Sequence, residues 1–181
     1  MHNEASVAGR TTMSIGINLE SAQVPDRRYV ADTANAIYSD DRIKFLFGQT
    51  KLDGGLRSLL IINFAADRLE TFLASVDAMQ QPSLREIIDH LQLQKVTLEE
   101  ISREPEQTTS LVANLIGAGV SGREACLDFY HISPFSIVKI SSTHKVALDP
   151  VVRIHIRTAL FEALIDRLKQ IKQQVPTGEQ T

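Results

Sequence analysis

Two stretches of this chain align without a gap: RYVADTANAIYSDDRIKFLFGQ at residues 28–49 and SLVANLIGAGVSGREACLDFYH at residues 110–131. Five of the twenty-two aligned pairs are identical, and in the first stretch they are Val30, Ala31, Ala36, Ser39 and Phe47. In both stretches an extended segment ends in a turn at Ser39 or Ser121, and a segment with alternating apolar residues follows. Alternation with a period of two is typical of a half-buried strand.

The correspondence resumes at residues 60–76 and 152–168, where the offset between the two copies has grown from 82 to 92 residues. Each of these segments begins with strand-like alternation and continues with apolar residues spaced by three and four, which is the spacing of a helix. The sequence therefore predicts an α+β fold built from two tandem ββββα-type units that together form a pseudo-dimer. We expect antiparallel sheets with helices on one face, because short polar or glycine-containing turns separate the strands.

The unit boundaries follow from these patterns. We expect a first ββββα unit at 11–80, a helical bridge at 81–109, a second unit at 110–174, and flexible tails at 1–10 and 175–181. The predicted strands of the first unit are 12–20, 28–38, 42–49 and 57–64, and those of the second are 110–120, 123–131 and 151–157. The second unit is longer by ten residues between its second and last strands, which indicates added or extended strands at 135–140 and 143–148, and the last helix is expected near 158–174.

Three pairs of residues have the spacing of a capping box, in which two side chains bond the free N–H groups at the start of a helix. They are Asp67 with Glu70, Ser83 with Glu86, and Thr97 with Glu100. The first predicts the start of the helix that ends the first unit. The other two predict that the bridge contains two short helices.

Composition narrows the classes of function. The chain has 181 residues and a net charge of −3, which argues against a protein that coats nucleic acid. Its single cysteine, Cys126, excludes an intrachain disulfide framework. The N-terminus lacks the apolar core of a signal peptide, and no run of 18 apolar residues occurs. We expect a cytoplasmic protein with no membrane partner.

No pattern of residues supports catalysis. Glycine-rich phosphate-binding motifs are missing, and the cluster Asp128, His131, His144 and His155 lacks tight ligand spacing. Cys126 lies in the middle of a predicted strand, where nothing local activates a thiol. Arg153, His155 and Arg157 form one face of a strand, which suggests either an anion site or simply its solvated side. We expect no enzyme activity, catalytic residue, metal ion or cofactor.

The strand around Leu59–Phe64 is apolar on both faces. One face packs on its own helix, which leaves Leu59 and Ile61 to meet another surface. Val138 and Ile140 of the insertion extend that surface. We therefore expect Leu59, Ile61, Val138 and Ile140 to line a site for a protein or unfolded polypeptide client or for a second subunit. Burial between the two units is the alternative.

The bridge also has the layout of a helix-turn-helix, so a regulator that contacts nucleic acid through residues 83–104 is the alternative function. The charges of the bridge weigh against binding to nucleic acid, because its three basic side chains are outnumbered by five acidic ones. The basic residues are Arg85, Lys95 and Arg103, and the acidic residues are Glu86, Asp89, Glu99, Glu100 and Glu104.

A motif in the second unit resembles a small bacterial family of unknown function with a core of the form AN … S-x-x-E-x-x-LDF. Its residues here are Ala113, Asn114, Ser121, Glu124, Leu127, Asp128 and Phe129, followed by the Arg153-Ile154-x-Ile156 strand. In layout, four strands and then a helix, the chain is also similar to SecB, a bacterial export-chaperone family. That resemblance implies two SecB-like units in one chain, no cofactor, and client polypeptides held in apolar grooves. It identifies no individual client-binding residue.

Overall fold

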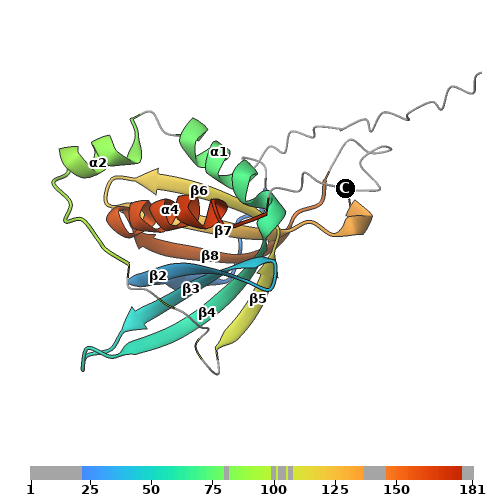
Figure 1. Ribbon diagram of the computed structural model, residues 1–181, viewed down its shortest axis with the longest axis horizontal. Helices are drawn as coiled ribbons and strands as arrows, with labels where there is room; N and C mark the ends of the chain where they lie inside the picture. Colours follow the sequence, from blue (N-terminus) through green and yellow to red (C-terminus); the bar gives the residue numbers. More distant parts are fainter. Residues whose placement is uncertain are drawn as a thin grey trace, which may run out of the picture.

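The computed structural model describes residues 22–79, 82–98, 101, 105, 108–136 and 146–176. Within them the protein is α+β, with two four-stranded mixed sheets and helices packed against them (Figure 1). The strands are β1 (Arg28–Val30), β2 (Thr33–Ser39), β3 (Arg42–Thr50), β4 (Leu56–Ala65), β5 (Thr109–Ala113), β6 (Leu115–Ser121), β7 (Glu124–His131) and β8 (Asp149–Arg157). The helices are a 3₁₀ turn (Ala66–Arg68), α1 (Leu69–Met79), α2 (Leu84–His90) and α4 (Thr158–Lys172). None of the helices in the described part is long and apolar enough to cross a membrane.

The strand orders are β2-β3-β4-β5 in one sheet and β1-β8-β7-β6 in the other. The expectation of antiparallel sheets is wrong at two places, because β1 pairs with β8 and β5 pairs with β4 in parallel. The predicted single strands at 28–38 and 110–120 are also wrong. Each is two strands in different sheets, so each half of the chain places its first strand on the sheet of the other half.

An aspartate and an asparagine hold the two points where the chain passes from one sheet to the other. Asp32 Oδ1 accepts a hydrogen bond from the N–H of Thr50 at 2.7 Å. Asn114 Oδ1 accepts one from the N–H of Ile132 at 2.7 Å, and its Nδ2 donates to the Ile132 carbonyl at 2.8 Å. These bonds join each crossing to the chain at the end of β3 or β7, because short polar side chains readily satisfy backbone groups at a kink. Asn114 thus has a structural role in this fold.

We expect Asn114→Ala to lower the free energy of unfolding by about 1–3 kcal/mol, since the half-buried N–H and C=O of Ile132 each lose a partner. Asp32→Asn is the control, because it keeps the acceptor for Thr50 and should change stability by about 0.5 kcal/mol or less. Urea unfolding followed by circular dichroism measures both. A similar loss in the two variants would contradict this role for the asparagine.

The two sheets have the same register. Every cross-strand pair in the β1-β8-β7-β6 sheet has its counterpart in the other sheet at the offsets of 82 and 92 residues seen in the sequence. Examples are Ala125 opposite Ile156 with Ile43 opposite Phe64, and Arg28 opposite Arg153 with Ser110 opposite Ile61. A β-bulge between Phe47 and Gly48 recurs between Phe129 and Tyr130. The offsets found in the sequence therefore describe the pairing of every strand in that sheet.

One core joins both sheets and the two long helices. The rings of Phe45 on β3 and Phe129 on β7 pack edge to face, with their centroids 5.4 Å apart. The inner faces of the two sheets therefore contact each other at these rings. The predicted apolar stripes of α1 and α4 are buried in this core. The side of each sheet turned away from it is called the outer face below.

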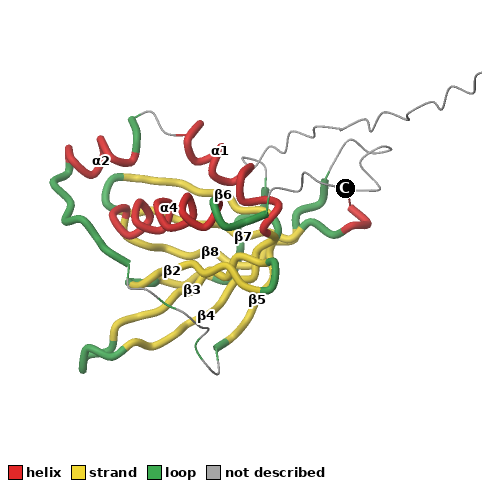
Figure 2. The backbone as a smooth tube through the Cα atoms, viewed as in Figure 1, coloured by secondary structure: helices red, strands yellow, loops and turns green. Residues whose placement is uncertain are grey.

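The predictions of helix starts have mixed outcomes. The capping box of Ser83 and Glu86 at the start of α2 is confirmed. The capping box of Asp67 and Glu70 is wrong, since Ala65 precedes a 3₁₀ turn there and no side chain caps it. Residues 93–98 and 101, which include the first residues of the second expected bridge helix, are not helical (Figure 2). Glu100 lies outside the described residues.

The predicted strand at 12–20 and the expected tail at 1–10 lie outside the described residues, and the strands predicted at 135–140 and 143–148 lie partly outside them. Phe135 and Ser136, the first two residues of the predicted strand 135–140, are helical.

Candidate functional site

The outer face of the β2-β3-β4-β5 sheet is covered by the chain itself. Ile37, Leu46 and Ile61 form a small apolar cluster on neighbouring strands, and Ile101 of the bridge packs against it. Ile61, one of the predicted partner-binding residues, is therefore only 3% exposed. The surface that meets it in this structure is the bridge.

The other predicted site residues do not join Ile61. Leu59 is the extra residue at the β-bulge, since Phe47 pairs with Leu60 and Gly48 with Ser58, and it packs against the main core. Val138 and Ile140 lie outside the described residues. A bulge changes the face on which a side chain lies, and the alternation of the sequence does not reveal it.

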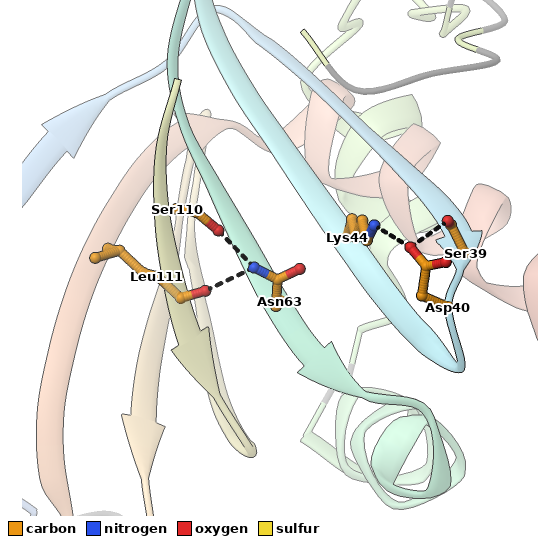
Figure 3. Close-up of polar contacts among 6 residues, drawn as sticks. All are labelled: Ser39, Asp40, Lys44, Asn63, Ser110 and Leu111. Atoms are coloured by element: carbon orange, nitrogen blue, oxygen red, sulfur yellow. Dashed lines mark hydrogen bonds and ion pairs between the residues drawn. The ribbon is translucent and has the colours of Figure 1, made fainter. Parts of the chain in front are cut away.

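The strands of this sheet also carry polar contacts, which Figure 3 shows. Lys44 Nζ bonds Asp40 Oδ2 at 2.7 Å, and Ser39 Oγ donates to the same oxygen at 2.8 Å. These bonds, the one from Lys44 above all, lower the pKa of Asp40. Asn63, the cross-strand partner of Lys44 on β4, lies on the same face, and its Nδ2 donates to Ser110 Oγ at 2.6 Å and to the Leu111 carbonyl at 3.2 Å. Asn63 thereby anchors β5 to β4.

The outer face of the β1-β8-β7-β6 sheet carries an ion pair at the equivalent place. Arg153 Nε and Nη2 bond the two carboxylate oxygens of Asp128, and the side chains are 21% and 14% exposed. The hydrogen bonds to Asp128 raise the pKa of Arg153 above its ordinary value. By the repeated register, Asp128 and Arg153 correspond to Leu46 and Ile61. One sheet thus holds a bidentate ion pair where the other holds an apolar pair.

That pairing weakens the hypothesis of an anion site at Arg153, His155 and Arg157. The charge of Arg153 is matched by Asp128, and Arg157 lies opposite Glu124 in the register. A bidentate carboxylate occupies the donors that an anion would need. The interpretation as a solvated strand face is better supported.

Cys126 and His155 are opposite one another on β7 and β8. Burial, and then the charge of Asp128, raise the pKa of the Cys126 thiol, which is the opposite of what a nucleophilic cysteine requires. Among the described residues no three His, Cys, Asp or Glu side chains are placed to hold a metal ion. His144 of the predicted cluster lies outside those residues.

Among the described strands, the sheet edges at β1 and β5 have no further strand paired to them. β1 and β5 are the outermost strands of their sheets, and the equivalent residues Val30 and Val112 are 64% and 51% exposed. The opposite edges differ, because α4 lies along β2, where Arg167 Nε donates to the Ala36 carbonyl at 3.2 Å, and α1 contacts β6. Val30 is one of the five identities between the aligned stretches. An identical apolar residue on an exposed edge was the signal that sequence reasoning passed over.

The backbone groups that these edges offer can be assigned. Arg153 N–H donates to the Arg27 carbonyl at 2.8 Å, and Ala31 N–H donates to the His155 carbonyl at 2.9 Å. Successive residues of a strand direct their backbone groups to opposite sides, so those of Arg28 and Val30 point away from β8. By the same register, those of Ser110 and Val112 point away from β4.

Comparison with protein-family models, with curated proteins and with solved structures found no match to this chain.

Proposed function

We propose that this protein is a non-enzymatic protein-binding module, chaperone-like or adaptor-like, that holds an extended segment of a partner polypeptide along an open sheet edge. The observation that carries the proposal is the pair of equivalent edge strands, each with an exposed valine and outward-facing backbone groups. Addition of a strand to such an edge is a common mode of peptide recognition, in which main-chain bonds supply affinity and side-chain contacts supply specificity. The proposed contact lies at the edges, away from Ile61.

The repeated register supports a further part of the proposal, that the chain is a pseudo-dimer of two related units. The exchange of β1 and β5 between the sheets ties the two units together, as in a dimer that swaps its first strands. The similarity in layout to SecB supports a chaperone-like role. A cytoplasmic location is part of the same proposal.

The alternative, contact of the bridge with nucleic acid, has less support. Leu84 and Ile88 of α2 are buried, and Ile101 covers the outer face of a sheet. The bridge therefore contributes packing to the fold, and its exposed charges are of mixed sign.

Val30→Lys tests the proposed function. We expect the wild-type protein to suppress the aggregation of heat-unfolding citrate synthase, and the variant to need a concentration higher by about fivefold or more for the same effect, equivalent to ~1 kcal/mol of binding. The reason is that a lysine on an edge strand opposes the addition of another strand. The melting temperature should not change, because Val30 is 64% exposed.

Leu52→Lys is the matched control, because Leu52 is fully exposed at the tip of the β3–β4 hairpin and lies on no edge strand. It should suppress aggregation as the wild type does. Absence of suppression by the wild type, or an equal loss in both variants, would contradict binding at the edge.

A further inference from the structure

The two open edges differ in their chemistry. β1 has three residues, carries Arg28 next to Arg27, and the carbonyl of Val30 accepts a hydrogen bond from Gln49 Nε2 at 2.9 Å. Short length, charge and occupied backbone groups are the features by which proteins protect an edge from unwanted pairing. β5 has five residues, Thr-Ser-Leu-Val-Ala, with neither charge nor proline. Its edge therefore carries none of these protections except its modest length.

β5 is also held in place for pairing. Asn63 bonds both the hydroxyl of Ser110 and the carbonyl of Leu111, so the middle of the strand is fixed to β4 by side-chain bonds in addition to the ladder (Figure 3). An edge strand that is already ordered loses less conformational entropy when a partner strand binds to it. The half-exposed Val112 beside this anchor adds apolar area to the same edge.

We infer that β5 pairs with β5 of a second copy of this chain, antiparallel and about a two-fold axis at Leu111, so that two four-stranded sheets join into one of eight strands. In this register Ser110 lies opposite Val112 of the partner subunit, and Val112 lies opposite the partner subunit's Ser110. These are the residues whose N–H and C=O point away from β4, so their backbone groups are matched in two hydrogen-bonded pairs.

The chemistry of the strand favours a second copy over another occupant. An uncharged strand meets its own copy without like charges in opposition, and the small side chains Ser110 and Ala113 allow close approach. An unprotected edge pairs with its own kind unless it is covered, and a closed two-fold contact covers it without leading to fibres. β1 then remains for the proposed client, because its arginines oppose a second copy of the same strand but not a client strand without basic residues. The dimer does not depend on that function.

Sedimentation velocity of the full chain over micromolar concentrations tests the inference. The wild type is expected to sediment as a dimer, and Val112→Lys as a monomer, with a dissociation constant raised by about tenfold or more because two cations enter a strand pair that lacks any anion. Val30→Lys, the same substitution at the equivalent position of the other edge, should remain a dimer. Unchanged melting curves by circular dichroism establish that both variants are folded.

Hydrogen exchange supplies a second measurement. The amides of Ser110 and Val112 should be protected in the dimer and lose protection in Val112→Lys, whereas those of Arg28 and Val30 should exchange alike in both. A monomeric wild type, a dimer that persists in Val112→Lys, or protection of the β5 amides only when citrate synthase is added would each overturn the inference. Failure of a dimeric wild type to suppress aggregation would instead overturn the proposed function and leave the dimer standing.

Discussion

Phe45→Ala is expected to lower the free energy of unfolding by about 3–5 kcal/mol, a larger loss than we expect for Asn114→Ala or for removal of the Asp128 carboxylate. The ring of Phe45 is fully buried. Its centroid lies 5.9 Å from that of Phe64 in its own sheet and 5.4 Å from that of Phe129 in the other sheet. Its removal would leave a cavity where the two inner faces meet. Such a loss is a large fraction of the stability of a typical domain, so the urea concentration at the midpoint of unfolding should fall clearly.

Urea unfolding followed by circular dichroism measures this effect. Phe135→Ala is the matched control, because Phe135 is 80% exposed and the same truncation there should cost about 0.5 kcal/mol or less. A loss below about 1 kcal/mol for Phe45→Ala would mean that the two sheets do not share a packed core at this ring cluster.

Asp128→Leu is expected to destabilise the protein by about 1–3 kcal/mol, because it leaves the half-buried guanidinium of Arg153 without its bidentate partner. The cost is smaller than for a fully buried pair, since 21% of the Arg153 side chain still reaches water. The equivalent position of the other sheet shows what replaces the pair, because Leu46 and Ile61 pack there without charge.

The double variant Asp128→Leu/Arg153→Ile copies that apolar pair and should recover most of the lost stability. Thermal melting of the two single variants and the double variant gives the coupling energy. If the double variant is less stable than Asp128→Leu alone, the apolar pair needs a cover such as the bridge over Ile61, and the two outer faces are not interchangeable.

Over much of the chain, the periodicity of apolar residues was enough to infer whether a segment is a strand or a helix. The strands β3, β4, β7 and β8 and the helices α1 and α4 repeat apolar residues at periods that one face of a strand or helix imposes. The start of α2 was equally predictable, since Ser83 and Glu86 bond each other's backbone within one turn. These are local effects, and neighbouring residues contain all the information they need.

The candidate site was less accessible to that reasoning. Leu59 and Ile61 were expected on one surface, but a bulge directs Leu59 to the main core and the bridge covers Ile61. The edges that the structure leaves open depend on which strand lies last in each sheet. That order is a property of the whole fold, and the exposed Val30 and Val112 become recognisable as equivalent edge residues only once it is known.

By itself the sequence determined the repeat, its two offsets and the period of each main element, because apolar spacing is a direct consequence of which face of an element is buried. Only the tertiary structure decided that β1 and β5 cross to the opposite sheet and pair in parallel. Backbone hydrogen bonds between strands carry no side-chain signature, and the bonds of Asp32 and Asn114 that hold the crossings reach residues 18 positions away. Partners so distant in the chain are brought together by the packing of the common core, and local pattern does not record them.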